Sequence, residues 1–555
     1  MNTPNLRSPE TVMRLDRMGA SFPTRISFMR RLIRLLSAEK AQVAEFAFEI
    51  DEEGYGHAVY AVPFGGYTYS LVAFSTPLEP ENRTDRVIAE AWDMTFVLFD
   101  GIPDEADITR LRKNTPLQEA GRFSEKELVL CRANKSVRMF EHVVECLVRG
   151  QQPSRDEVRK IGYLARTTAV YGNGKFGIAD RADFAARPHM AAPFVAEMLA
   201  VWLVRGFTHR LVNHVAGHRG GDKAVPLAAD IQRHLGIGNA TGLGMAPYLV
   251  SHPVLLHNWV QARETAFARA LAIETLSQAE QTRAAELVAR ARAHIDDWCV
   301  ADSTQMPRIT ALRAELAAMA EGFSDLMAGK FPLLALQKQS ADLSLEAQEW
   351  VVAFAIEMAG EKVDDLADQM ADDNPAPFDP TQTLDAFKSD LHEHLNWALS
   401  FDFKDKFQCR KFWYVSEEKL EPRIGDRFEE EGAALESPLD IARKMQVLAA
   451  DLAQRDAATL AGFLAAHPEH RFAARRVQIA ARHCYSELRE NLIAQSMRPI
   501  DMLRFKLAFF GANKFDPKSD LWTRITMYQG APLFEDIADD DADDWWLPVL
   551  TEGAT

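Results

Sequence analysis

Residues 57–75, HAVYAVPFGGYTYSLVAFS, decide the fold of the first part of the chain. β-Branched and aromatic residues fill both halves of this stretch, and Pro63-Phe64-Gly65-Gly66 interrupts them with the residue types of a turn. The pattern predicts two strands separated by a tight turn. The same enrichment predicts further strands at Ala44–Ile50, Thr95–Phe99 and Glu127–Cys131. We therefore expect residues 1–152 to form an α/β region with a short twisted sheet.

The rest of the chain has the composition of helices. Ala, Leu, Glu, Arg and Gln dominate from residue 155 to about residue 370, and apolar residues recur with helical spacing between residues 275 and 320. We expect a helical bundle at residues 153–370 and a second helical region at residues 381–555. The predicted fold class is mainly α, a multi-domain helical-bundle architecture with a small N-terminal α/β region.

The C-terminus is acidic, with EDIADDDADD at residues 535–544. A run of like charges is typical of a solvated tail, so we expect this segment to face water. Trp545 and Trp546 follow it, and their large apolar rings should pack against a neighbouring surface.

Composition limits the partners of the protein. The formal net charge is −17, from 80 acidic and 63 basic residues, whereas nucleic acids and anionic membranes attract basic surfaces. The five cysteines include no CxxC pair, and the N-terminal residues lack the apolar core of a signal peptide. The longest apolar run, residues 191–204, is too short to span a bilayer. We expect a soluble, cytoplasmic protein that binds neither nucleic acid nor membrane.

The first candidate binding segment is the glycine-rich turn YGNGKFG at residues 171–177. Glycines let a backbone approach an anion closely, and a lysine beside them adds positive charge. The glycines have the GxGxxG spacing of a dinucleotide-binding loop, but no βαβ unit surrounds them, and the following Phe176 rules out a Walker A loop. A tight loop with a purely structural role is the alternative. The residues assigned to anion binding are Gly172, Asn173, Gly174 and Lys175.

The second candidate segment is GIGNATGLGMAP at residues 236–247, with four glycines in nine residues. Such a loop costs conformational entropy, so either a ligand or close packing must compensate. Asn239 and Thr241 offer hydrogen-bonding side chains for a ligand. A close crossing of two helices is the alternative.

Arginines in constrained segments are candidates for capturing a carboxylate or phosphate. Arg132 follows a predicted strand, Arg166 precedes the first glycine-rich turn, and Arg423 lies between Pro422 and Gly425. The alternative is that they form salt bridges with the many acidic residues of the chain.

Histidines gather between residues 209 and 257. His214 and His218 have the i,i+4 spacing that allows two imidazoles to share a metal ion, but neither HExxH nor a di-iron pattern surrounds them. No metal is therefore assigned. His214 or His252 is instead the expected general base, because the ordinary histidine pKa lies near neutrality.

Together these features favour a metabolic enzyme that acts on a small carboxylate- or phosphate-bearing molecule by general acid–base chemistry. The expected site lies where the two glycine-rich segments approach each other, and neither a reaction class nor a cofactor is assigned. A non-catalytic helical scaffold or regulatory partner is the second hypothesis. A metal- or haem-dependent enzyme that uses the histidines from His209 to His218 is the third. The long helices would also suit a homodimer.

Overall fold

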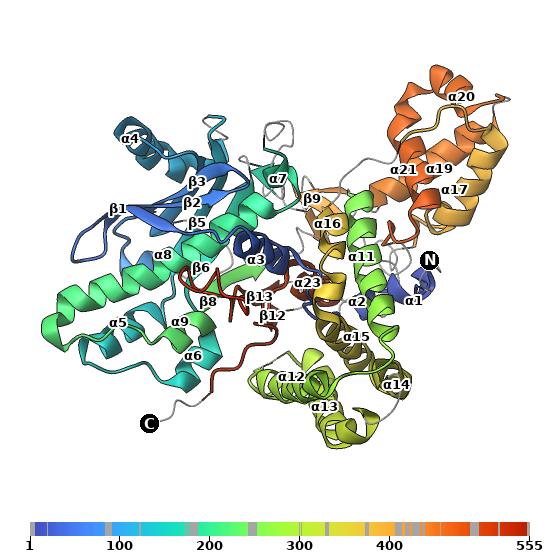
Figure 1. Ribbon diagram of the computed structural model, residues 1–555. Coiled ribbons are helices and arrows are strands. Elements are labelled where there is room, and N and C mark those ends of the chain that lie inside the picture. The colour runs from blue at the N-terminus through green and yellow to red at the C-terminus, as the bar shows by residue number, and fades with distance from the viewer. Residues whose placement is uncertain are drawn as a thin grey trace.

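The chain forms one large β-sheet with helices packed on it and a bundle of helices beside it, as the computed structural model shows (Figure 1). The described residues are 6–18, 20–83, 91–120, 124–172, 175–176, 187–241, 252–298, 300, 302–327, 332–371, 377–405, 413–416, 422–424, 433–435, 439–454, 457–488, 499–519 and 522–551.

Ten strands form the large sheet in the order β1-β2-β3-β4-β5-β6-β8-β13-β12, with the short strand β7 paired to β6. Neighbouring strands are antiparallel except β6 and β8, which run parallel. Gly65 and Gly66 connect β2 to β3, and both have positive φ, as a two-residue hairpin turn requires. The strands are β1 (Ala44–Ile50), β2 (Gly56–Phe64), β3 (Tyr67–Ser75), β4 (Met94–Asp100), β5 (Glu127–Lys135), β6 (Tyr163–Gly172), β7 (Lys175–Phe176), β8 (Gly236–Thr241), β12 (Lys514–Ser519) and β13 (Trp522–Met527).

The strands expected in the first 150 residues are confirmed, but the predicted fold class is wrong. The sheet is not a small N-terminal feature, because β8 and the hairpin β12–β13 extend it with residues from the two regions that were expected to be helical. The molecule is therefore a mixed structure in which helices and a large sheet share one core.

Glycine explains why β8 resembles a loop in the sequence. A Cβ atom on Gly236 would lie 2.2 Å from the carbonyl oxygen of Met527 on β13, and one on Gly238 would lie 2.8 Å from the ring of Tyr163 on β6. Because the neighbouring strands approach so closely, only glycine fits at these two positions. Close packing within a sheet accounts for these two glycines of the second glycine-rich segment.

Helices cover the two faces of the sheet unequally. The long helix α8 (Val195–Gly220) crosses one face over β3, β4, β5, β6 and β8, with α3 (Phe28–Ala38) and α5 (Phe140–Val148) packed against it. This face carries the main hydrophobic core. On the other face, α4 (Glu105–Asn114) buries Leu111 over a smaller core that contains Val72, Val97 and Leu130.

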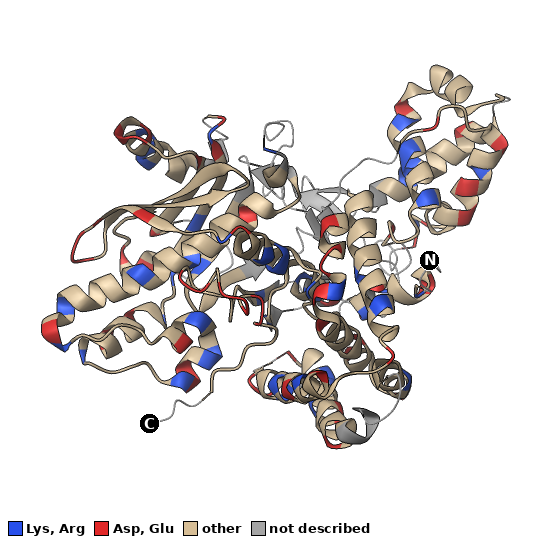
Figure 2. Cartoon of the chain, viewed as in Figure 1, with Lys and Arg blue, Asp and Glu red and all other residues tan. Residues whose placement is uncertain are grey.

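A helical bundle lies between β8 and β12 in the sequence and includes the helices expected between residues 275 and 320. Basic and acidic residues are interspersed along α12 and α13 (Figure 2). No helix in the described part of the chain is long and apolar enough to cross a membrane. The bundle helices are α11 (Pro253–Leu271), α12 (Gln278–Asp296), α13 (Gln305–Met327), α14 (Pro332–Gln339), α15 (Leu345–Ala359) and α16 (Leu366–Ala371).

A smaller group of helices projects from the rest of the molecule, at the upper right of Figure 1. We call it the helical unit; it consists of α17 (Leu384–Leu399), α19 (Leu439–Ala453), α20 (Leu460–Ala466) and α21 (Arg471–Arg482). The remaining elements include the short helices α1 (Pro9–Val12), α2 (Leu15–Met18), α6 (Arg155–Ile161), α7 (Pro188–Ala191) and α9 (Ala229–His234), helix α23 (Pro499–Phe510), and a small sheet of β9 (Trp413–Ser416), β10 (Pro422–Ile424) and β11 (Ala433–Leu435).

The N-terminal residues contact the bundle through buried ion pairs. Arg7 bridges Glu264 on α11 and Glu349 on α15 at 2.7 and 3.0 Å, and Arg17 and Arg263 lie 2.5 and 2.8 Å from Glu349. Burial raises the pKa of Glu349, but the guanidinium groups of Arg7, Arg263 and Arg17 outweigh burial and lower it below its ordinary value. The N-terminal segment therefore neutralises carboxylates inside the bundle.

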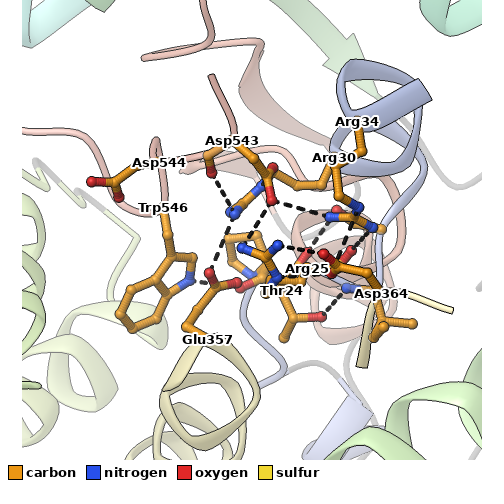
Figure 3. Close-up of polar contacts among 12 residues, drawn as sticks. Thr24, Arg25, Arg30, Arg34, Glu357, Asp364, Asp543, Asp544 and Trp546 are labelled. Atoms are coloured by element: carbon orange, nitrogen blue, oxygen red, sulfur yellow. Dashed lines mark hydrogen bonds and ion pairs between the residues drawn. The ribbon is translucent and has the colours of Figure 1, made fainter. Parts of the chain in front are cut away.

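A second cluster of charges joins three distant parts of the chain (Figure 3). We call it the arginine clasp; it consists of Arg25, Arg30 and Arg34 with Glu357, Asp364 and Asp543. Arg30 donates from Nε to Oδ1 of Asp543 at 2.5 Å and from Nη2 to the Asp543 carbonyl at 2.7 Å. Arg25 pairs with Asp364 at 2.6 Å and with Asp543 at 2.9 Å. The clasp thus fixes the C-terminal segment to α3 and to the bundle.

The expectation that the acidic tail is simply solvated is wrong at its end. Asp543 lies in the clasp, and Asp544 pairs with Arg283 and Arg290 on α12. Trp545 and Trp546 are only 3% and 1% exposed, which confirms that they pack against neighbouring surfaces. Arginines of distant segments, rather than water alone, therefore pair with the carboxylates of Asp543 and Asp544.

We expect Asp543→Asn to lower the free energy of unfolding by about 3–5 kcal/mol, because it leaves three arginines facing only two carboxylates in a largely buried site. Asp541→Asn is the matched control, since Asp541 is exposed and has no ion pair to a described residue. Urea unfolding measures both variants. Equal stability of the two variants would contradict a structural role for the clasp.

Among the described residues, five buried histidines have a lowered pKa and make the fold sensitive to acid; one of them is His57 on β2. The other four, His209, His234, His257 and His294, are between 4 and 6% exposed. Burial lowers the pKa of each, to about 3 for His234 and about 4 for His257. A lowered pKa in the folded state stabilises the fold above the unfolded-state pKa of about 6.5, and this contribution is lost as the pH falls toward the folded-state values.

The free energy of unfolding should therefore fall below about pH 6.5, by about 1.4 kcal/mol per pH unit for each histidine that gains a proton only on unfolding. His234→Gln should flatten this dependence, whereas the exposed His392→Gln should leave it unchanged. Urea titrations at three pH values between neutral and mildly acidic measure the slope. A slope that His234→Gln does not alter would show that the histidine is not held uncharged by the fold.

Candidate functional site

A cavity of about 760 Å³ lies beside α8. Small-molecule sites are typically about 300–1,000 Å³, so its size suits a metabolite. The lining side chains come from three parts of the chain that lie far apart in the sequence. They are Gln42, Val43, Glu45 and Tyr60 from β1, β2 and the residues before β1; Trp202, Arg205, Gly206, His209, Arg210 and Asn213 from α8; Gln232 from α9; and residues 532–535, 537 and 538 from the C-terminal segment.

One face of α8 supplies more of the polar side chains of the cavity than any other element does. Arg205, His209 and Asn213 are four residues apart, and Trp202, Gly206 and Arg210 have the same spacing. Residues three and four apart lie on one side of a helix, so these two rows are neighbours along the same face.

Arg205 joins this face of α8 to the C-terminal segment. Its guanidinium group donates to the carbonyl oxygens of Leu235, Arg233 and Gln232 on one side, and of Pro532 and Ala531 on the other, at 2.7–3.2 Å. Burial and the nearby Arg233 lower the pKa of Arg205 to about 9. Because every bond goes to backbone carbonyls, the role of Arg205 is to build the cavity wall.

Phe534 forms part of that wall and packs on a glycine. Its ring lies 5.0 Å from the ring of Trp202 and 5.9 Å from that of Tyr60. A Cβ atom on Gly206 would lie 2.0 Å from the Phe534 ring. Glycine disfavours the interior of a helix, and this contact explains why α8 nevertheless has a glycine there.

A carboxylate, a phenol and a guanidinium group meet at the other side of the cavity. Tyr60 donates from its hydroxyl group to Oε2 of Glu45 at 3.2 Å, and Arg210 donates from Nε to the same oxygen at 3.1 Å. The guanidinium group of Arg210 also stacks on Phe48, 4.4 Å from its ring centroid. The terminal nitrogens of Arg210 have no hydrogen bond to a described residue, so they are available to bind an anion.

His209 and Asn213 add polar groups of fixed orientation. Burial and the neighbouring Arg205 lower the pKa of His209 well below its ordinary value, and one ring nitrogen bonds the Leu235 carbonyl. The other nitrogen of this neutral imidazole is therefore a hydrogen-bond acceptor. Asn213 accepts the Leu227 N–H at its Oδ1 at 2.8 Å, which leaves its NH₂ group to donate elsewhere. Both side chains line the cavity.

Arg132, Arg166 and Asn239, which were predicted to bind an anion, lie on strands of the large sheet and do not line this cavity. Arg166 on β6 is paired in register with Gly238 on β8, and Thr167 with Asn239, so the two glycine-rich segments do belong to adjacent strands. Asn239 donates to the Thr167 hydroxyl group at 2.9 Å. Arg132 on β5 stacks over Trp92, 4.2 Å from its ring centroid.

Most of the first glycine-rich turn, and parts of other predicted sites, fall outside the described residues. Gly172 ends β6 and is paired with Lys175 on β7, so a β-hairpin occupies this position. Asn173 and Gly174 lie outside the described residues, as do the side chains of Lys175, Thr241 and Arg423. Their roles in anion binding therefore remain predictions.

The two histidines predicted to act as the base have different surroundings. His214 lies one turn beyond Arg210 on α8; its Nε2 is 2.9 Å from the carbonyl oxygen of Asp51, and its ring contacts those of Phe48 and His218. Arg210, which lines the cavity, and His214 thus both contact the ring of Phe48. His252 is exposed and directly precedes α11. Neither histidine lines the cavity.

Sequence reasoning missed Glu45, Tyr60, Arg205, Arg210 and Asn213. The one available signal was the spacing of polar residues in the otherwise apolar helix α8, where Arg205, His209 and Asn213 recur every four positions. The participation of residues 532–538 has no local signal, because it depends on contacts across more than 300 residues.

Because of the contact between Gly206 and Phe534, we expect Gly206→Ala to change the free energy of unfolding in the direction opposite to the usual one. Gly→Ala inside a helix ordinarily stabilises by up to about 1 kcal/mol. Here Gly206→Ala should instead destabilise by about 1–3 kcal/mol, because its methyl group overlaps the Phe534 ring. In a Phe534→Ala background the same substitution should become neutral or stabilising. Urea unfolding of the four proteins of this cycle measures the coupling, and additive effects would show that the two residues are not in contact.

Comparison of the chain with protein-family models, with curated proteins and with solved structures finds no match. The function must therefore be argued from the geometry and chemistry of the site.

Proposed function

We propose that the protein is a metabolic enzyme that binds a small carboxylate- or phosphate-bearing molecule in the cavity beside α8 and acts on it by acid–base chemistry. The observation that carries this proposal is the convergence of Arg210, His209 and Glu45 on one cavity of suitable size. Guanidinium groups bind carboxylates and phosphates through two parallel hydrogen bonds, and Arg210 presents such a pair of donors.

The surrounding residues supply what acid–base chemistry needs. Glu45 can take up a proton from a bound molecule, and the neutral His209 imidazole can accept a hydrogen bond from it. Burial and the Glu45 carboxylate raise the pKa of Tyr60 well above its ordinary value, so its phenol stays protonated and can only donate. The Asn213 NH₂ group offers a further donor. The site thus combines a proton acceptor and several hydrogen-bonding groups with a cation that orients the substrate.

The proposal predicts that some small carboxylates or phosphates raise the melting temperature of the purified protein by mass action. Arg210→Met should weaken binding of such a compound about 10- to 150-fold, the cost of losing hydrogen bonds to a charged group. Calorimetric titration measures the affinity. Arg219→Met is the matched control: it removes an arginine from the same helix whose partners, Glu141 and Glu53, do not line the cavity.

A different binding site, general electrostatic attraction and a non-catalytic role each predict a different result. If affinity falls in Lys175→Met but not in Arg210→Met, the anion binds at the end of β6 and not in the cavity. Equal losses in Arg210→Met and Arg219→Met would indicate general electrostatic attraction. A compound that binds through Arg210 but is never converted would favour the regulatory protein over the enzyme.

A further inference from the structure

The helical unit contains a cluster of side chains that neither the cavity nor the arginine clasp involves. Among the described residues, one group of three or more potential metal ligands comes together, and it consists of Asp451, His467, Glu469 and His470. One ligand atom from each residue lies within 4.8 Å of those of the other three. The histidines His209, His214 and His218, considered from the sequence, do not form such a group.

The distances within the cluster suit a shared metal ion. Nε2 of His470 lies 2.7 Å from Oδ2 of Asp451, and Nδ1 of His467 lies 3.1 Å from Oε1 of Glu469. Around a tetrahedral zinc ion with bonds of about 2.0–2.1 Å, neighbouring ligand atoms are about 3.3 Å apart. The two measured pairs lie near this separation, and all four ligand atoms lie within 4.8 Å of one another, so the four side chains are near enough to share one ion.

Rigid local structure holds the two imidazoles in place. The Phe463 ring on α20 stacks against both, with ring centroids 5.0 Å from His467 and 5.8 Å from His470. The backbone N–H groups of His467 and His470 donate to Phe463 and His467, which fixes the turn between α20 and α21. Asp451 lies in the last turn of α19, where the helix dipole favours a cation.

Hydrogen bonding inside the protein does not satisfy the whole cluster. Nε2 of His467 is buried and has no hydrogen-bond partner among the described residues. The His467 and His470 side chains are 18% and 7% exposed, whereas that of Glu469 is 60% exposed, so an ion could enter from solvent on the Glu469 side. Two imidazoles and two carboxylates are a donor set typical of zinc and related divalent transition metals.

We propose that Asp451, His467, Glu469 and His470 bind one divalent transition-metal ion, with zinc as the best match. The ion connects the end of α19 to the turn before α21, and so braces the helical unit. With four protein ligands the site has no open position, which is typical of structural and not catalytic zinc.

The test uses the full-length protein, stripped with EDTA and then titrated with zinc chloride. Wild-type protein should bind one equivalent with a rise in melting temperature, and cobalt(II) should give the visible absorption of a tetrahedral site. Replacement of both His467 and His470 by alanine should abolish tight binding and the cobalt spectrum. The matched control, His392→Ala, removes an exposed imidazole of α17 in the same unit and should retain both.

Asp451→Asn keeps the shape of the side chain and tests the site in case the histidine variant does not fold. It should weaken zinc binding at least tenfold, with far-UV circular dichroism unchanged. No zinc binding to wild-type protein would overturn the proposal. Undiminished binding to either the double histidine variant or Asp451→Asn would overturn it as well.

Discussion

The arginine clasp is the interaction on which the arrangement of the chain depends. Arg25, Arg30 and Arg34 lie on and just before α3, Asp364 and Glu357 belong to the bundle, and Asp543 belongs to the C-terminal segment. Three segments separated by hundreds of residues therefore share one buried set of charges. Because an unpaired buried charge is costly, each segment stabilises the position of the other two.

The clasp has a direct consequence for the cavity. Residues 532–538 lie just before Asp543 and form one wall of it. This wall is fixed at its other end by Arg205 and Trp202, which bond the carbonyl oxygens of Ala531 and Pro532. The C-terminal segment is thus held on both sides, and the cavity exists because a tail that was predicted to be solvated is bound to two helices.

The sequence predicted local structure better than long-range structure. The strands β1 to β5 were found because their residues carry the composition of strands, and α12 and α13 because their apolar residues repeat with helical spacing. β8 was missed because its glycines, required by the close approach of β13 and Tyr163, are also typical of loops. The sequence WTRITM of β13 has the residue types of a strand, but the neighbouring sequence has those of helices, so no strand was predicted there. β13 changes the fold class because it pairs with β8 and extends the large sheet.

For the site, too, the sequence predicted local features better than long-range contacts. Arg132, Arg166 and Asn239, chosen from the sequence, do lie on neighbouring strands, yet the cavity is built mainly by one face of α8 and the C-terminal segment. The C-terminal segment is therefore expected to be a fixed wall of the cavity. Amide hydrogen exchange tests it most directly, by comparing residues 528–546 with residues 205–213 of α8 in wild-type protein and in Arg30→Met. The account predicts slow exchange of both segments in wild-type protein and a joint loss of protection in the variant. Exchange of residues 528–546 at the rate of an unstructured peptide, beside a protected α8, would contradict it.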